Sequence, residues 1–362
     1  MSPDDLERRL TEAFGEQARR AVDDQAPIPP MQVDRPAQHR PRRPISKVLA
    51  PLAAAAAIAA VAVGIAVHQD NHASRPSAVG PVTSHSASIT SAASTRPTLA
   101  AQPVHVSLQN SDGAQVGVGM PIIAYLSRPI ADAQAFNAAT RVTVDGKPVS
   151  GAWYFEYKTG LPGKPIEADW RMATYWPGHA RIHMDLPVKG LSAGSGLSYN
   201  DDLSLDFSTG PANIVTVDDK SHVMTVVSDG VKWGSFPVSL GAPTTPTLHG
   251  IKVIMEKGAN ICMTGPGYSE CGIKYTQRLT YGGEYLHAAP WNTKHIAAGI
   301  DSSNGCTNLT IADAEKLYGL LEIGDVVNYP DANGRHMTMS DGYGDWNVSW
   351  ATWLTGGLFR TR

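Results

Sequence analysis

Residues 301–310 read Asp301-Ser302-Ser303-Asn304-Gly305-Cys306-Thr307-Asn308-Leu309-Thr310. Small and turn-forming side chains fill the run up to the cysteine, which predicts a tight loop. Thr310 is suited to cap a helix that begins there. The apolar face of this helix would consist of Ala314, Leu317, Leu320 and Leu321. Strand-forming residues resume at 325–329, so this half of the chain contains one clearly patterned helix among strands.

Strand patterns separated by turn residues fill most of the chain after residue 102. Alternating side chains predict a first group of strands at 104–108, 122–126, 142–144 and 180–184. A second group is predicted at 214–217, 223–227 and 251–255. The spacing of the first group is typical of a β-sandwich of about 100 residues. We therefore predict a mainly β fold with few helices.

The charge balance argues against a nucleic-acid partner. Only 17% of the residues are charged and the net charge is -3, whereas proteins that bind nucleic acid carry a basic surface. We expect no such partner.

An uncharged run from Val48 to Val67 is long enough to cross a hydrocarbon core about 30 Å thick. Basic residues cluster just before it, at Arg40, Arg42, Arg43 and Lys47. Only Arg75 follows closely, so the positive-inside rule places the N-terminus in the cytoplasm. A cleaved signal peptide is the alternative, but its apolar run would be shorter and nearer the N-terminus. We predict a single-pass membrane anchor, with everything after it extracytoplasmic.

Composition divides the chain into six predicted parts. They are a cytoplasmic segment at 1–45, a transmembrane helix at 46–68, a flexible stalk at 69–101, a β-sandwich at 102–209, a second β-rich domain at 210–331 and a C-terminal tail at 332–362. The tail carries three tryptophans at helical spacing, namely Trp346, Trp350 and Trp353. One helical face could hold all three and pack on the domains.

Three cysteines in an exported region allow one disulfide and one free thiol. Cys262 and Cys271 flank the turn-rich segment 263–270, which a bridge would pin. Cys306 is then unpaired, in a loop whose amides lie near the positive end of a helix dipole. Such a setting favours a thiolate and can hold an oxyanion. A buried, inert thiol is the alternative, because unpaired cysteines are often buried.

A reactive thiol needs a base, and two histidines are candidates. His287 ends a strand-like stretch, where a ring nitrogen could reach the thiol. His295 lies in the predicted loop 292–300, where an exposed surface histidine is the ordinary expectation. One thiol and two histidines at irregular spacing match no zinc pattern, so we predict neither metal nor cofactor.

Three stretches of the second β-rich domain resemble the catalytic domain of bacterial L,D-transpeptidases. They are Phe236-Pro237-Val238-Ser239-Leu240-Gly241, His287-Ala288-Ala289-Pro290-Trp291 and Ser303-Asn304-Gly305-Cys306-Thr307-Asn308 before the capped helix. Segments 151–154, 175–177 and 344–347 are similar to the two-module form of this family. The resemblance covers about 103–355 and implies an immunoglobulin-like β-sandwich followed by a catalytic domain.

The resemblance also implies a reaction, an acyl transfer through a thioester. Cys306 would attack the carbonyl that joins the third residue of a stem tetrapeptide to its terminal D-alanine. The D-alanine leaves, and a side-chain amine of a neighbouring stem accepts the acyl group while His287 moves protons. The implied partners are peptidoglycan stem tetrapeptides as donor and acceptor, with β-lactams of the carbapenem type as covalent inhibitors.

The family pattern assigns further roles around these two residues. Backbone amides of Asn304, Gly305 and Cys306 would stabilise the oxyanion, and the carbonyl of Ala288 would orient the histidine. Substrate contacts are implied at Tyr268, in a lid over the stem peptide, and at Trp291, Ser303 and Asn308. A bridge between Cys262 and Cys271 would stiffen that lid, as a feature of this chain rather than of the family.

One position departs from the family, which usually has histidine two residues before the cysteine. Asn304 stands there instead, and an amide can orient by hydrogen bonding but cannot titrate near neutral pH. A wall-binding or scaffolding protein with a weakened site is therefore one alternative. Another is an L,D-carboxypeptidase or protein-anchoring enzyme, which would send the same thioester to water or to a protein amine.

Overall fold

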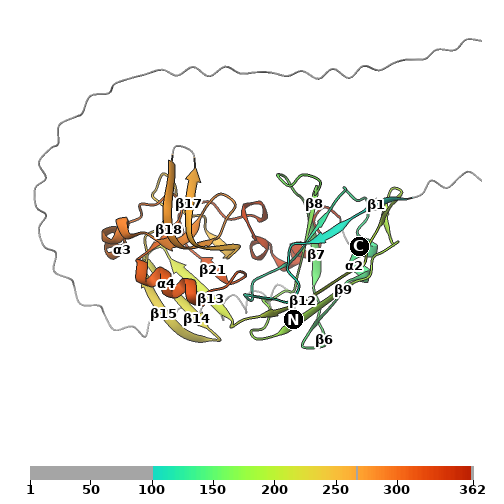
Figure 1. The fold of residues 1–362 in the computed structure, drawn as a ribbon, viewed down its shortest axis with the longest axis horizontal. Coiled ribbons are helices and arrows are strands. Elements are labelled where there is room, and N and C mark those ends of the chain that lie inside the picture. The colour runs from blue at the N-terminus through green and yellow to red at the C-terminus, as the bar shows by residue number, and fades with distance from the viewer. Residues whose placement is uncertain (1–100, 266–267, 360–362) are drawn as a thin grey trace, which may run out of the picture. The chain divides into compact units, whose positions relative to one another are not determined.

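The computed structural model describes residues 101–265 and 268–359 (Figure 1). The predicted cytoplasmic segment, the transmembrane helix and the stalk up to residue 100 lie outside these residues. Within the described ranges, no helix combines the length and the apolar character that crossing a bilayer requires. The prediction of a mainly β fold with few helices is confirmed.

The first domain is a set of antiparallel and mixed sheets around one core. Its elements are β1 (Gln102–Val104), β2 (Val106–Leu108), β3 (Ala114–Val116), β4 (Ile122–Leu126), α2 (Gln134–Ala139), β5 (Arg141–Val144), β6 (Lys147–Pro148), β7 (Ala152–Tyr157), β8 (Ile166–Arg171), β9 (Arg181–Leu186), β10 (Ser192–Gly194), β11 (Leu197–Tyr199) and β12 (Leu203–Thr209). Two larger sheets have the orders β3-β12-β9-β5-β6 and β2-β4-β8-β7, and a smaller one has the order β1-β11-β10. Side chains of both larger sheets belong to one buried cluster.

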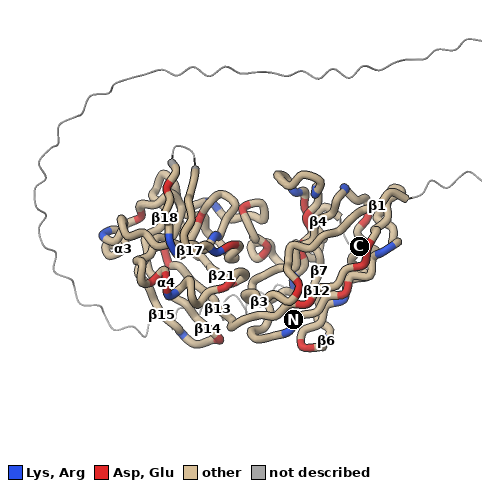
Figure 2. The backbone as a smooth tube through the Cα atoms, viewed as in Figure 1, with Lys and Arg blue, Asp and Glu red and all other residues tan. Residues whose placement is uncertain are grey.

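The core of this domain follows from its strand patterns. Strand β9 alternates buried and more exposed residues, as expected where one face is covered, whereas every residue of β4 and β8 is buried. Helix α2 contributes Phe136, whose ring packs against three aromatic rings at centroid distances of 5.1, 5.8 and 5.4 Å, those of Trp153, Phe155 and Tyr199. Figure 2 shows acidic and basic residues interspersed along the described chain.

The second domain contains two sheets and the helix that the sequence predicts. One sheet has the order β15-β14-β13-β21-β16 and consists of β13 (Asn213–Asp218), β14 (Val223–Ser228), β15 (Val231–Pro237), β16 (Gly250–Val253) and β21 (Val326–Tyr329). The other has the order β17-β18-β19-β20 and consists of β17 (Glu256–Gly265), β18 (Tyr268–Arg278), β19 (Tyr285–Ala288) and β20 (Thr307–Leu309). The short helices η1 (Pro290–Asn292) and α3 (Thr293–Ala298) and the longer α4 (Ile311–Leu320) complete the domain.

Helix α4 forms where the sequence predicts it. Thr310 Oγ1 accepts a hydrogen bond from the Asp313 amide at 3.2 Å and donates one to the Asp313 carboxylate at 2.7 Å. This reciprocal cap satisfies an amide that the first turn leaves open. Ala314 and Leu317 are buried in a cluster that joins the helix to both sheets, so the helix fixes the end of the loop 301–306 that leads into β20.

The tail differs from the prediction of one helical face. Trp346 lies in the 3-10 helix η3 (Asp345–Asn347), which follows η2 (Met339–Asp341), and the separate helix α5 (Trp350–Trp353) holds the other two tryptophans. All three rings surround the Arg171 guanidinium, at 4.7, 5.4 and 4.2 Å from its central carbon. A buried cation therefore collects the three rings, and no continuous helix is needed to bring them together.

We expect Leu317→Ala to lower the free energy of unfolding of the second domain by about 2–5 kcal/mol, because it leaves a cavity beneath α4. The matched change Lys316→Ala, on the exposed face of the same helix, should cost about 0.5 kcal/mol or less. Denaturant titration of both variants measures the difference. Equal costs would show that α4 does not carry the core contact assigned to it.

Candidate active site

The pairing of β19 with β20 brings Cys306 and His287 to one part of the second domain. The two strands run parallel, with Leu286 opposite Thr307 and His287 opposite Asn308. Cys306 immediately precedes β20, so the same register sets it beside the start of β19. Cys306 lies two residues before Asn308, the register partner of His287, so the alternation of side chains in a sheet predicts that the thiol and the imidazole share a face.

The tautomer of His287 is fixed by its neighbour. The ring is buried, and Nδ1 lies 2.9 Å from the carbonyl oxygen of Ala288. A carbonyl oxygen can only accept, so Nδ1 carries the hydrogen and Nε2 presents a lone pair. Burial lowers the pKa of His287, and the bond to the Ala288 carbonyl opposes this effect. The ring is therefore a neutral proton acceptor near neutral pH.

The thiol of Cys306 is free and only 8% exposed. Its Sγ donates to the carbonyl oxygen of Gly283 at 3.5 Å and receives a hydrogen bond from the backbone amide of Tyr285. Burial raises the pKa of Cys306 to about 11, while the Tyr285 amide acts in the opposite direction. At neutral pH the resting site thus pairs a neutral thiol with a neutral imidazole.

Two side chains hold the loop before Cys306 by hydrogen bonds. One belongs to the loop itself, and the other to a neighbouring segment. Gly305 has φ of +101°, in the region that favours glycine. Ser303 Oγ accepts from the Gly305 amide at 3.2 Å and donates to the Cys306 carbonyl at 2.6 Å, and Thr247 Oγ1 donates to the Gly305 carbonyl at 3.0 Å. The Gly305 amide, a predicted oxyanion donor, is thus engaged by Ser303 in this structure.

Asn304 is exposed and lines a cavity of about 190 Å³ beside this loop. Glu284 and Gly305 also line it, and Arg335 and Asp341 contribute an ion pair to its wall. The residue that departs from the family pattern therefore borders open space next to the nucleophile.

The remaining predicted contacts lie around the imidazole. Trp291 is 56% exposed and stacks on the His287 ring with centroids 6.0 Å apart. Asn308 is buried and exchanges both backbone hydrogen bonds with Ser239. Its side-chain oxygen is buried and has no hydrogen-bond partner among the described residues.

The predicted lid is an extension of the hairpin β17–β18. The prediction of a turn-rich loop at 263–270 is wrong for most of that segment, because Cys262 and Cys271 face each other across paired strands that continue beyond them. Residues 263–265 pair with residues 268–270. The two sulfur atoms are bonded. Tyr268 begins β18, and its side chain lies outside the described part of the structure.

His295 belongs to helix α3, so the loop predicted at 292–300 is partly helical. Its ring is exposed and its Nδ1 contacts Asn292 Oδ1 at 2.8 Å. No hydrogen bond of the described residues joins it to Cys306. The structure therefore gives His295 a local contact, as for a surface histidine.

One group of side chains in the described ranges could hold a metal ion. It consists of Asp219, His222 and Asp301, whose ligand atoms lie within 4.8 Å of one another. His222 Nε2 also pairs with Asp301 Oδ1 at 3.1 Å, so the imidazole already has a partner. The group includes neither Cys306 nor His287.

Two residues beneath the nucleophile were missed by the sequence analysis. Lys252 on β16 is fully buried and forms an ion pair with Glu284, which precedes β19. A lysine inside the apolar run 251–255 was the available signal, because buried lysines are rarely left unpaired. Nothing in the sequence marks Glu284 as its partner.

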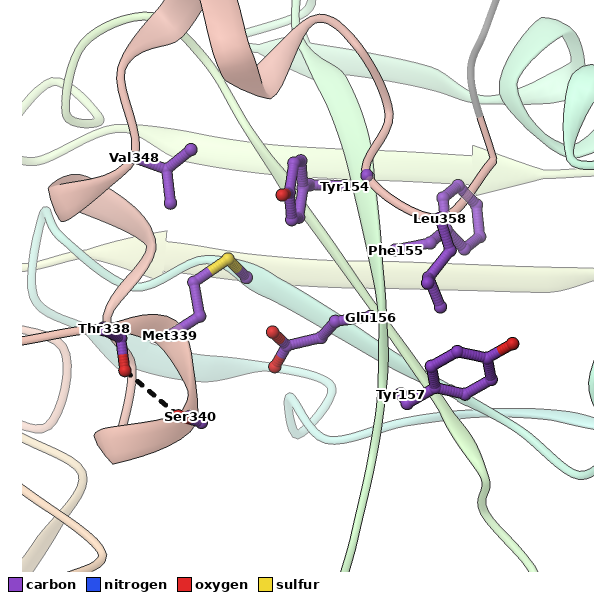
Figure 3. Close-up of a pocket in the computed structure, with 10 residues that line it drawn as sticks. Tyr154, Phe155, Glu156, Tyr157, Thr338, Met339, Ser340, Val348 and Leu358 are labelled. Carbon is purple, nitrogen blue, oxygen red and sulfur yellow. Dashed lines mark hydrogen bonds between the residues drawn. The ribbon is translucent and has the colours of Figure 1, made fainter.

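A larger hollow of about 350 Å³ lies elsewhere, between β7 and the C-terminal segment. Glu156 and Tyr157 come from β7, and Met339 and Ser340 come from η2 (Figure 3). It contains none of the predicted site residues, so it is distinct from the cysteine site.

Comparison with known families assigns residues 212–328 to the L,D-transpeptidase catalytic domain and residues 78–192 to the bacterial Ig domain. L,D-transpeptidase 2 of Mycobacterium tuberculosis is 28% identical over 266 residues, which cover 70% of this chain and 63% of that protein. L,D-transpeptidase 5 of the same species is 32% identical over 262 residues, covering 70% and 56%. The chain thus spans less than two thirds of the length of these relatives.

The fold of this chain is also similar to that of a solved LD transpeptidase structure. The LD transpeptidase LdtMt1 in complex with imipenem matches with a TM-score of 0.50 and 25% identity, over 63% of this chain and 99% of that one. The arrangement of the thiol and the oriented imidazole lies within the matched catalytic domain. The chain therefore contains a segment that matches the bacterial Ig domain, at 78–192, followed by a segment that matches the L,D-transpeptidase catalytic domain, at 212–328.

Proposed function

We propose that this protein cross-links peptidoglycan stem peptides as an L,D-transpeptidase through a thioester on Cys306. One observation carries the proposal: the bond from His287 Nδ1 to the Ala288 carbonyl leaves Nε2 as a proton acceptor on β19, which pairs with the strand that begins directly after the free thiol of Cys306. The family relationship of the catalytic domain supports the same reaction.

The reaction has two acyl-transfer steps. His287 Nε2 takes the thiol proton while Cys306 Sγ attacks the carbonyl carbon between the third residue of the donor stem and its terminal D-alanine. The tetrahedral oxyanion collapses, the D-alanine amine leaves with the proton from His287, and a thioester remains. The side-chain amine of an acceptor stem then attacks the thioester carbon and gives a proton to His287. The carbon–sulfur bond breaks, and the proton returns to the thiol.

The backbone of the catalytic loop supplies the oxyanion contacts in this proposal. The amides of Asn304 and Cys306 act with that of Gly305, which Ser303 Oγ must release as the oxyanion forms. Ser303 therefore acts on the loop. Trp291 covers the imidazole.

We also propose an extracytoplasmic location with a single-pass anchor at 46–68. The uncharged run and the basic residues before it support this topology. A bridge between Cys262 and Cys271 suits an oxidising compartment, where it stiffens the hairpin over the donor stem.

Removing the Cys306 sulfur should abolish both the reaction with carbapenems and the cross-linking of stem peptides. We expect the full chain to gain the mass of one carbapenem molecule in intact-protein mass spectrometry with imipenem, and to convert stem tetrapeptides to cross-linked dimers. Cys306→Ala should give neither product, because no other described thiol is free. The control that replaces both Cys262 and Cys271 with alanine should keep the adduct. Release of D-alanine without dimers would instead indicate a carboxypeptidase.

The Asn304 position allows a gain-of-function test. Asn304→His should raise the rate of dimer formation by about tenfold, because a titrating ring beside the nucleophile can share in proton transfer. Asn304→Gln, which cannot titrate, is the matched control. Since the side chain is exposed, both variants should keep the stability of the parent protein. No gain from histidine would contradict a proton-transfer role at this position.

The pKa of Cys306 sets a pH dependence. With a pKa of about 11, the thiolate fraction and hence the rate of alkylation by iodoacetamide should rise about tenfold per pH unit between pH 7 and 9. The carbapenem reaction should in addition fall in acid, where His287 becomes protonated and can no longer accept a proton. A rate of alkylation independent of pH over this range would contradict a buried, protonated thiol.

A further inference from the structure

A buried ion pair lies directly beneath the nucleophile. Lys252 is 0% exposed, and its Nζ donates to Glu284 Oε2 at 2.5 Å. The same ammonium lies 3.8 Å from the centre of the Tyr329 ring. Desolvating two charges costs several kcal/mol for each ion, so such a pair is retained only with good geometry or for a specific purpose.

Glu284 holds the segment that contacts the sulfur. Its neighbours on either side are Gly283, whose carbonyl accepts from Cys306 Sγ, and Tyr285, whose amide donates to it. The Glu284 carboxylate also accepts from the Leu248 amide at 2.8 Å. Side-chain bonds to Lys252 and to Leu248 thus fix the backbone on both sides of the thiol.

The carboxylate also lies against the catalytic loop. A Cβ added to Gly305 would lie 3.4 Å from Glu284 Oε1, so the loop and the carboxylate are in close approach. On the other side of the pair, the Tyr329 hydroxyl hydrogen-bonds to Thr307 Oγ1 at 2.7 Å, one residue after the nucleophile. The ion pair is therefore linked to residues on both sides of Cys306.

The two charges act on the thiol in opposite directions. After the larger effect of burial, the Glu284 carboxylate raises the pKa of Cys306, and the Lys252 ammonium lowers it by a smaller amount. Burial also lowers the pKa of Lys252, while the carboxylate opposes that effect. The two members of the pair thus shift the pKa of Cys306 in opposite directions.

We propose that Lys252 and Glu284 are positioning residues for the nucleophile: their salt bridge fixes the 283–285 backbone against the Cys306 sulfur, and the Lys252 ammonium offsets the repulsion between the Glu284 carboxylate and the developing thiolate. The inference rests on the proposed thioester chemistry. A purely structural pair would support folding without affecting the reactivity of the thiol.

The test reads the thiol itself, in the full chain with the Cys262–Cys271 bridge intact. The rate of iodoacetamide alkylation is measured against pH for the parent, Lys252→Met and Glu284→Gln. Loss of the cation should move the midpoint of the profile upward by about one pH unit, and loss of the carboxylate should move it downward by about as much. Lys257→Met is the matched control: Lys257 also packs over a ring, that of Tyr318, but bonds to carbonyls of 318 and 321. It should leave the midpoint unchanged.

The double variant, Lys252→Met with Glu284→Gln, covers the case in which a single change prevents folding, because replacing both members of a buried pair is often tolerated. It should fold, yet react with imipenem at least about tenfold more slowly, since the sulfur loses its fixed neighbours. Midpoints that move in the same direction, or a folded double variant with the parental imipenem rate, would overturn the proposal. If the midpoints separate as expected but no stem peptide is cross-linked, the positioning role stands and the proposed function fails.

Discussion

The parallel pairing of β19 with β20 is the constraint on which the site depends. It joins segments that are separated by the helix α3 and the catalytic loop, and it sets His287 opposite Asn308. A shift of one residue would turn the imidazole to the other face of the sheet and leave the thiol without a base. Helix α4 and its Thr310 cap hold β20 from one side, and the exchange of hydrogen bonds between Asn308 and Ser239 holds it from the other.

Burial gives this site its chemical character. The same desolvation that raises the pKa of Cys306 lowers that of His287, so both groups rest uncharged at neutral pH. Charge separation then occurs only when a proton moves between them. The Tyr285 amide already bonds to the sulfur, whereas in the proposed mechanism the Gly305 amide must first leave Ser303 Oγ.

Local patterns predicted the parts of the fold that local forces determine. The strands at 214–217 and 223–227 and the capped helix α4 needed only alternation, turn residues and a capping side chain. The pairing of Lys252 with Glu284 could not be predicted, because the two residues meet only through the stacking of separate strands. The strand pairing of 263–265 with 268–270, beyond the two cysteines, was likewise not predicted from the residues of that segment.

In the candidate site, the sequence named the nucleophile, the base and the loop but not the internal bonding of that loop. The engagement of the Gly305 amide by Ser303 depends on a rotamer, which no spacing reveals. The tail tryptophans show the same limit. Their spacing was compatible with one helical face, yet a cation on β8 decided where the rings lie.

That cage of indole rings around Arg171 imposes an order on biosynthesis. Residues 346–353 follow the second domain along the chain but complete the packing of the first. The ribosome synthesises the chain from its N-terminus. The Arg171 guanidinium therefore stays solvated or transiently paired until the whole catalytic domain has been translated. The earlier module is thus the last to be finished.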